Sequence, residues 1–178
     1  METLTSGLAT TEEVVGFQTV DTDNMHRMRL LNSVLFPVHY SNSFYRGLLR
    51  PGQFAQLATV GKAYVGTIAC RKQPLGFASG PVVMQNGSGP EMLEVYMMTL
   101  GVLAPYRRLG VGRQLLQHAI EYARKDAMVK KMVLHVQIDN DDALRFYHKH
   151  GFSTIRMVER YYKAIEPPHA YLLEYRIR

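Results

Sequence analysis

A glycine-bearing turn that joins a strand-like run to a helical run constrains this chain more than any other feature. The turn spans 101–112, and its last glycines, Gly110 and Gly112, stand where apolar residues begin to recur at helical spacing. Glycine lets backbone N–H groups approach a ligand closely, and the first N–H groups of a helix lack partners within the helix. Since a helix N-terminus also carries partial positive charge, the turn predicts an anion site suited to a pyrophosphate. An ordinary strand-to-helix turn is the simpler alternative.

Strand-like and helical patterns alternate along the rest of the chain. A hairpin turn is expected at Gly61-Lys62, and Asn140 is expected to cap the last helix. Strands that alternate with helices after a hairpin predict a mixed α/β sheet. We expect strands at about 14–20, 55–60, 64–71, 91–100, 131–138, 152–158 and 170–177, and helices from a cap at Asp21 or Thr22 to about Phe36 and at about 41–50, 112–124 and 141–149.

Size and composition limit the classes of protein to consider. A chain of 178 residues suits one domain, here expected over 13–178, with a disordered segment at 1–12 and a long loop rich in Gly, Pro and Ser at 73–90. No apolar run approaches the ~20 residues that cross a bilayer, and the first residues do not resemble a signal peptide. The single cysteine, Cys70, excludes an internal disulfide, is expected in the core and fits a reducing compartment.

The net charge of +6 favours an anionic partner. Three explanations fit it: an anionic cofactor, an RNA-rich neighbour such as a ribosome, or solubility alone. Lys and Arg occur only in short pairs such as Arg107-Arg108 and Lys130-Lys131. Direct nucleic-acid recognition is therefore not expected as the main function.

Two motifs connect the turn to a known family. Arg107-x-x-Gly110-x-Gly112 matches the Arg/Gln-x-x-Gly-x-Gly/Ala signature of GNAT acetyltransferases, and Asn140-x-x-Ala143-x-x-Phe146-Tyr147-x-x-x-Gly151-Phe152 resembles their downstream cofactor segment. No Gly-Lys-Ser/Thr follows, so the turn is not a Walker loop. The resemblance implies an α/β GNAT fold, with a central mixed, mostly antiparallel sheet of about seven strands flanked by about four helices, and acetyl-CoA as the cofactor with no metal. The cofactor-binding residues that it implies are Leu100, Gly101, Val102, Arg107, Arg108, Leu109, Gly110, Val111, Gly112, Asn140, Ala143, Phe146 and Tyr147.

The resemblance extends to one class within this family. Several segments are similar to the catalytic subunits of NatE N-terminal acetyltransferases, and the similarity covers about 14–166, nearly the whole chain. The loop at 73–90 is longer than expected in that class, which fits disorder better than a lineage-specific contact. The segments that carry the resemblance are Leu35-Phe36-Pro37-Val38-His39-Tyr40, Tyr96-Met97-Met98-Thr99-Leu100-Gly101, Leu103-Ala104-Pro105-Tyr106-Arg107-Arg108, Leu134-His135-Val136-Gln137 and Tyr161-Tyr162-Lys163-x-Ile165-Glu166-Pro167.

Acetylation of an α-amine needs only a modest base. The pKa of an α-amino group is near 7.7–8.0 and that of lysine near 10.4, so roughly a quarter of α-amines but about one lysine in a thousand are neutral at physiological pH. The NatE resemblance implies that Tyr96 and His135 remove the proton through an ordered water, with His135 supplying basicity near neutral pH. It also implies that Tyr147 lies near the cofactor sulfur. Taken singly, His135 and Tyr96 also fit as core residues, and Tyr147 as a residue that only packs on the pantetheine arm.

The same resemblance implies that two loops grip the substrate peptide. Their apolar residues suit the flexible thioether of a retained initiator Met, and their tyrosine hydroxyls can bond to peptide backbone. We therefore expect acetylation of N-termini that begin with Met followed by an apolar residue, with minor lysine acetylation. The implied substrate-binding residues are Phe36, Pro37, Val38, Tyr40, Met98, Tyr161, Tyr162 and Ile165.

Rival interpretations remain at this point. They are a lysine acetyltransferase, a small-molecule acetyltransferase, and a weakly active or non-catalytic subunit of the NatA complex. The resemblance implies association with the NatA catalytic and auxiliary subunits near the ribosome, and hence a cytoplasmic and also nuclear location. No membrane partner and no sequence-specific nucleic-acid binding is expected. The presence of both motifs and of Tyr96, His135 and Tyr147 favours an active enzyme.

Overall fold

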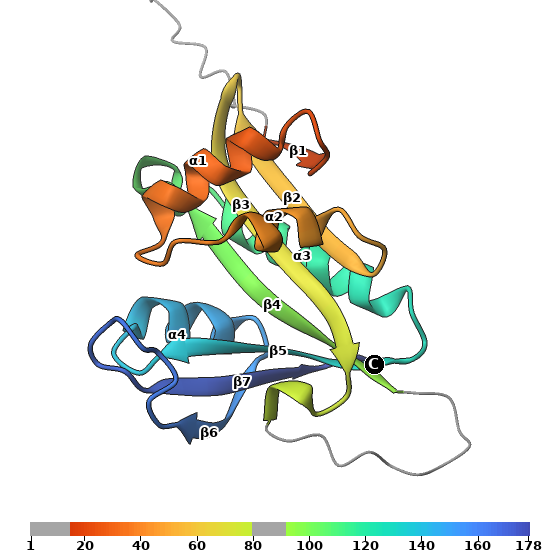
Figure 1. Cartoon of the computed structure of the whole chain (residues 1–178), viewed down its shortest axis with the longest axis vertical. Helices are drawn as coiled ribbons and strands as arrows, with labels where there is room; N and C mark the ends of the chain where they lie inside the picture. Colours follow the sequence, from red (N-terminus) through yellow and green to blue (C-terminus); the bar gives the residue numbers. More distant parts are fainter. Residues whose placement is uncertain (1–14, 80–91) are drawn as a thin grey trace, which may run out of the picture.

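The fold is a single twisted sheet with helices on both faces. The computed structural model describes residues 15–79 and 92–178, so the expected disorder at 1–12 and residues 80–90 of the expected loop lie outside the described part. Figure 1 shows the seven-stranded sheet, in the order β1-β2-β3-β4-β5-β7-β6. Neighbouring strands pair antiparallel except β4 and β5, which are parallel. The expected mixed, mostly antiparallel sheet is confirmed.

Each predicted strand and helix is found, with its ends shifted by a few residues. Two short 3₁₀ turns, η1 (Phe77–Ser79) and η2 (Ala104–Tyr106), were not expected. The strands are β1 (Val15–Thr19), β2 (Gln53–Val60), β3 (Ala63–Pro74), β4 (Leu93–Val102), β5 (Val129–Gln137), β6 (Ser153–Val158) and β7 (Ala170–Arg176). The helices are α1 (Met25–Leu35), α2 (Asn42–Leu48), α3 (Val111–Arg124) and α4 (Asp141–Lys149).

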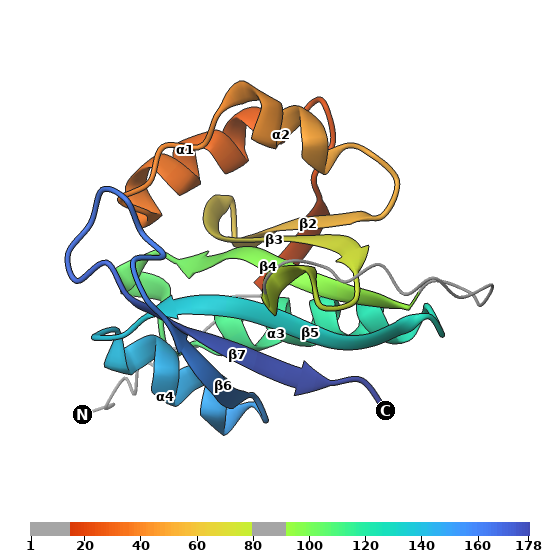
Figure 2. The same ribbon diagram turned by 60° about the horizontal axis from the view of Figure 1, so that its bottom comes forward.

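Helices cover both faces of the sheet. The α1 and α2 helices lie over one face, and α3 and α4 lie on the opposite face (Figure 2). Along α3, Leu115, Leu116 and Ala119 are buried at helical spacing, whereas α1 buries Met25 and Met28. Full burial of such a side chain stabilises the fold by roughly 1.5–3 kcal/mol, so these stripes fix the helices on the sheet. No helix in the described part of the chain is long and apolar enough to cross a membrane.

The sheet opens between its two parallel strands. Pairing of β4 with β5 ends at Tyr96 and Val133. Beyond that pair β4 continues to Val102 and β5 to Gln137. The two strands are therefore not hydrogen-bonded to each other in this stretch, and side chains from both can contact a molecule bound between them.

A β-bulge in β4 lies at the same point. Strand β3 pairs Ala69 with Thr99 and Cys70 with Met97, which leaves Met98 as an extra residue in β4. A bulge bends its strand and increases the local twist, so it accounts for the turning of β4 away from β5. Cys70 itself is fully buried, which confirms the expected core thiol.

A buried carboxylate holds the turn that follows β3. Glu94 on β4 is 0% exposed. Its oxygens accept hydrogen bonds from the N–H groups of Gly76 (3.0 Å) and Ala78 (2.8 Å) and from the amide of Gln73 (2.8 Å). The Lys131 ammonium lies 3.7 Å away. The start of the predicted loop is therefore the end of β3 and an ordered 3₁₀ turn, because one carboxylate satisfies the turn's N–H groups.

Replacing this carboxylate should destabilise the whole fold. A Glu94→Leu substitution leaves the N–H groups of Gly76 and Ala78 without an acceptor, so the free energy of unfolding should fall by about 2–4 kcal/mol. Urea denaturation measures it. Glu121→Gln, at an exposed position on α3, is the control and should change stability by less than about 0.5 kcal/mol. Equal effects of the two substitutions would contradict the role of Glu94.

Candidate active site

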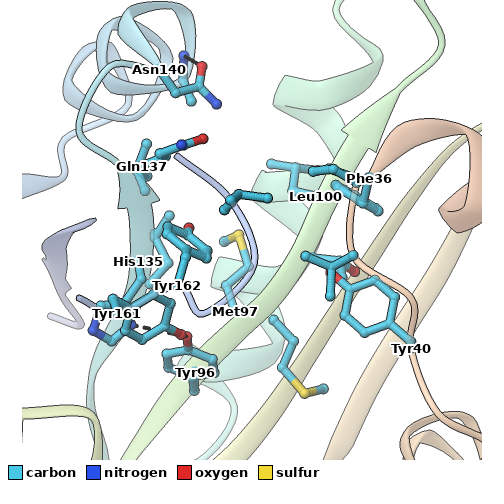
Figure 3. Close-up of a pocket in the computed structure, with 18 of the residues that line it drawn as sticks. Phe36, Tyr40, Tyr96, Met97, Leu100, His135, Gln137, Asn140, Tyr161 and Tyr162 are labelled. Carbon is cyan, nitrogen blue, oxygen red and sulfur yellow. Dashed lines mark hydrogen bonds between the residues drawn. The ribbon is translucent and has the colours of Figure 1, made fainter. Parts of the chain in front are cut away.

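A cavity of about 530 Å³ occupies the opening between β4 and β5. This volume lies within the range of ligand pockets, roughly 300–1,000 Å³. The connection from α1 to α2 and the connection from β6 to β7 form its other walls (Figure 3). Every residue predicted to bind the substrate lines this cavity: Phe36, Pro37, Val38, Tyr40, Met98, Tyr161, Tyr162 and Ile165.

Tyr96, His135 and Tyr161 form one hydrogen-bonded cluster in the cavity wall (Figure 3). The Tyr96 hydroxyl lies 3.0 Å from His135 Nδ1 and 2.7 Å from the Tyr161 hydroxyl. The Tyr161 ring stacks on the imidazole, with ring centroids 4.0 Å apart. Tyr96 is the last β4 residue paired with β5, and His135 lies just beyond the last paired β5 residue. The structure therefore brings the predicted catalytic pair together where the strands part.

Burial sets the charge of this cluster. Desolvation raises the pKa of Tyr96 far above its usual range, so the phenol stays protonated. Desolvation also lowers the pKa of His135 to about 4; the positive charge of Arg156 lowers this pKa further, whereas Glu94 opposes the shift. His135 is neutral at physiological pH, with a lone pair on one ring nitrogen. His135 is thus a weaker base than an ordinary histidine, whose pKa lies near neutral, because most of its ring is buried away from solvent.

Tyr147, the third predicted catalytic residue, projects from α4 into the cavity lining. Its hydroxyl donates a long hydrogen bond, 3.5 Å, to the sulfur of Met97. Burial raises the pKa of Tyr147 above its usual range, so this phenol also keeps its proton. A thioether is a weak acceptor. A stronger acceptor such as a thiolate would therefore take this hydrogen bond from Met97.

The turn before α3 has the geometry of an anion site. Gly110 adopts a left-handed φ of 78° at the N-cap of α3, and Arg108 has a φ of 67°. Alternation of left- and right-handed backbone turns successive N–H groups toward one side. A Cβ on Gly112 would point at side-chain atoms of Val102 and Phe146, 3.6 and 3.8 Å away. These are ordinary van der Waals distances, so the glycine leaves at most a methyl-sized gap between the end of β4 and α4.

The predicted cofactor residues fall into two groups. Leu100, Asn140, Ala143 and Tyr147 line the cavity, and the Asn140 side chain caps α4 by accepting from the Ala143 N–H at 3.1 Å. Arg107 Nε donates to the carbonyl of Val102 at 3.0 Å, which braces the turn. The second group does not line the cavity. It lies on the end of β4, on the turn, in the first residues of α3 and on α4: Gly101, Val102, Arg107, Arg108, Leu109, Gly110, Val111, Gly112 and Phe146.

Several cavity residues were not identified from the sequence. Consecutive residues of β5 contact the cavity because the strand has lost its neighbour there, a long-range event that no local pattern indicates. The Thr99 hydroxyl is buried and has no hydrogen-bond partner within residues 15–79 and 92–178, so it can bond to a ligand. No group of three or more His, Cys, Asp or Glu in these ranges could hold a metal ion. The added lining residues are Phe44, Arg71, Met97, Thr99, Leu134, Val136 and Gln137.

Comparison with known proteins identifies the family. A sequence model of the acetyltransferase (GNAT) family matches residues 17–152. The chain belongs to the GNAT acetyltransferase family. This GNAT protein is 39% identical to N-alpha-acetyltransferase 50 of Danio rerio over 155 residues, which cover 87% of the chain and 84% of that relative. It is also 39% identical to the probable N-acetyltransferase san of Drosophila melanogaster over 155 residues, 87% of the chain and 77% of that relative.

Solved structures agree with this assignment. Naa50 of Arabidopsis thaliana, in complex with the bisubstrate analogue CoA-Ac-MVNAL, has a TM-score of 0.76 and 38% identity, and the match covers 90% of this chain and 97% of that one. NAA60 of Arabidopsis thaliana in complex with acetyl-CoA has a TM-score of 0.78 at 21% identity, over 92% of this chain and 100% of that one, which shows the shared fold alone. The predicted GNAT fold and the resemblance to NatE-type N-terminal acetyltransferases are confirmed.

Gly101 sets the distance between β4 and the loop that follows α1. A Cβ at this position would lie 2.9 Å from Phe36 Cζ and 3.1 Å from Leu35 Cδ1. Real Cβ atoms do not approach so closely, so any larger residue here must displace Phe36. Phe36 lines the cavity on the side of the predicted peptide site.

A Gly101→Ala substitution should therefore change peptide binding. We expect the KM for an N-terminal peptide to rise about fivefold, which corresponds to an overpacking cost of ~1 kcal/mol. Steady-state kinetics at saturating acetyl-CoA measure this effect. The matched control is Gly47→Ala on α2, where a Cβ would meet nothing within 4 Å. A KM that rises equally in both variants would contradict this role of Gly101.

Proposed function

We propose that this GNAT protein is an acetyl-CoA-dependent protein N-α-acetyltransferase that acts on N-termini in which a retained Met is followed by an apolar residue. The observation that carries the proposal is the hydrogen-bonded pair of Tyr96 and His135, placed where β4 and β5 part and facing an apolar pocket. The 39% identity to N-alpha-acetyltransferase 50 supports the same activity here.

The residues present fit acetyl-CoA. The N–H groups at the start of α3 suit its diphosphate, and the cavity between β4 and β5 has the volume to take the end of its pantetheine arm. When bound, acetyl-CoA supplies the thioester acetyl group that the amine attacks. The protonated phenol of Tyr147 would donate a hydrogen bond to the sulfur of the bound cofactor. The analogue bound by the Arabidopsis relative, which joins CoA, an acetyl group and a peptide, supports this arrangement.

The low basicity of His135 suits an α-amine. The amine must be neutral to attack, and roughly a quarter of α-amines already are at physiological pH. Bonding to the acetyl carbon makes the nitrogen more acidic, and an amide that still carries the extra proton on nitrogen is a strong acid, so even a base with a pKa of about 4 can accept that proton, directly or through a water. The Tyr96 hydroxyl holds the imidazole at Nδ1. A lysine, which is almost fully protonated, gains little from such a weak base, so lysine acetylation is the minor activity.

The pocket walls support a preference for apolar N-termini. Phe36, Val38 and Ile165 contribute apolar surface to the cavity. Burial raises the pKa of Tyr40 and that of Tyr162 to about 12, so both hydroxyls stay protonated and can donate to peptide carbonyls. A carboxylate at the second peptide position would lose its hydration in these surroundings without a partner. The peptide part of the Arabidopsis analogue, MVNAL, begins with Met and Val, which supports the same choice here.

The proposal also includes the partners of this protein and its location in the cell. Similarity to NatE-type enzymes over most of the chain supports association with the NatA catalytic and auxiliary subunits, and with them a position near the ribosome in the cytoplasm, with a nuclear fraction as well. Co-purification of the tagged chain with NatA subunits tests this association. Recovery of the chain without either subunit would contradict it.

A panel of N-terminal peptides tests the activity. With acetyl-CoA and the isolated chain, kcat/KM for peptides that begin Met-Leu or Met-Val should exceed that for Met-Asp or Met-Glu by at least about tenfold, because a charged side chain is costly to desolvate. The Ile165→Ala substitution removes apolar surface from the cavity wall, so it should reduce the ratio of kcat/KM between the apolar and the acidic peptides. Peptides with a blocked N-terminus and a free lysine should react far more slowly. A preference for acidic starts, or equal rates for blocked peptides, would contradict the proposal.

A further inference from the structure

Two arginines flank the catalytic pair on the solvent side of the site. We propose that Arg71 and Arg156 select substrates by attracting acidic side chains that follow the first two residues of the peptide. This inference rests on the proposed N-terminal acetyltransferase function and adds a second determinant to it. The cavity recognises the first two residues of the peptide by apolar contact, and the two arginines recognise the charge of the residues that follow them.

Arg71 lies at the mouth of the cavity. It is exposed, lines the cavity and holds its guanidinium 5.3 Å from the ring centroid of Tyr96. Its Nε donates to the side-chain oxygen of Gln73 at 3.0 Å, and Gln73 in turn donates to the buried Glu94. The hydrogen bond to Gln73 thus orients the guanidinium, and within the described residues its remaining N–H groups are available to a ligand.

Arg156 lies in the same row of the sheet as the catalytic histidine. On one face, Arg156 of β6 pairs with Leu172 of β7, and Leu172 pairs with His135 of β5. Adjacent strands are about 4.8 Å apart, so Arg156 and His135 are separated by about 10 Å of backbone. Arg156 is exposed and is steadied by a hydrogen bond of 2.6 Å from its Nη2 to the carbonyl of Ser79. Its charge helps to lower the pKa of His135, which agrees with this proximity.

The acids nearby do not cancel these charges. Within residues 15–79 and 92–178, neither Arg71 nor Arg156 forms a salt bridge. Glu94 is enclosed by its own hydrogen-bond donors, and Glu174 is paired with both Lys131 and Arg176. The loop between β6 and β7, residues 159–169, carries two acids and two bases that offset each other: Glu159, Glu166, Arg160 and Lys163.

The spacing fits the third to fifth residues of a peptide. An extended chain advances about 3.3 Å per residue, so these residues lie about 7–13 Å from an α-amine held near His135. That range includes the distance of about 10 Å to the Arg156 backbone. Exposed ion pairs are individually weak, but charges at the rim of a site raise association rates and discriminate between partners. We therefore expect a preference for acidic residues at these positions and not an absolute requirement.

Peptides of one series test the proposal. All begin Met-Leu and differ only by Glu, Gln or Lys at one of positions three to five. For the wild-type chain, kcat/KM for the best Glu position should exceed that for Lys at the same position by about three- to tenfold, and this ratio should fall toward one at 1 M salt. In Arg156→Glu, the ratio of kcat/KM for the Glu peptide to that for the Lys peptide should be lower than the wild-type ratio by a similar factor. Arg156→Lys, which keeps the positive charge, should retain most of the wild-type ratio.

Two controls separate charge from structure. Arg156→Gln keeps a polar side chain but loses the charge, so the ratio should fall part of the way toward one, because Arg71 remains. Lys125→Glu, at the exposed C-cap of α3, changes the net charge as much as Arg156→Glu but should leave the ratio as in the wild type. Comparing Glu and Lys peptides within one variant cancels any effect of Arg156 on the basicity of His135.

The outcomes distinguish this inference from the proposed function. Acetylation of the neutral Gln peptides with equal rates for Glu and Lys peptides would overturn the role of the arginines and leave the N-terminal activity intact. If the preference of the wild type for Glu over Lys peptides persists unchanged in Arg156→Glu and Arg156→Gln, the proposed role of Arg156 is also overturned. No acetylation of any peptide in the series would instead contradict the proposed function itself.

Discussion

The site depends on the early end of pairing between two parallel strands. Strands β4 and β5 share only a short ladder and then diverge, and the bulge at Met98 provides the bend. The divergence leaves a space in the middle of an otherwise continuous sheet, lined by side chains of rigid elements. Sites built on strands hold their groups more precisely than sites on loops. Both the proposed catalytic pair and the start of the turn at 101–112 lie along these two strands, so one backbone feature positions them together.

Burial does most of the chemical tuning. Tyr96 and Tyr147 keep their protons and His135 stays neutral, because burial raises the pKa of both phenols and lowers that of the imidazole. The active site is thus a set of neutral donors and one weak acceptor. Such a site suits a nucleophile that is already partly neutral in solution. Positive charge lies at the rim, on the exposed Arg71 and Arg156.

Much of this fold could be predicted from the sequence, because its helices and strands carry clear periodicity. The stripe of Leu115, Leu116 and Ala119 indicated α3, and the glycines before it indicated the cofactor turn. Local patterns could not predict the parting of β4 and β5, since it depends on a bulge defined by pairing with β3. They also missed the ordered turn around Glu94, whose donors come from residues far along the chain. The weak basicity of His135 follows from burial and from Arg156, and neither is visible in the sequence nearby.

The central claim is that Tyr96 and His135 act as one proton-accepting unit and take no part in binding coenzyme A. The most direct measurement is kcat, together with the Kd for coenzyme A, for Tyr96→Phe, His135→Ala and the double variant. The account predicts that His135→Ala lowers kcat by about a hundredfold or more, that the double variant is little slower than His135→Ala, and that coenzyme A affinity stays near the wild-type value. Unchanged turnover in His135→Ala, or losses that multiply in the double variant, would contradict it.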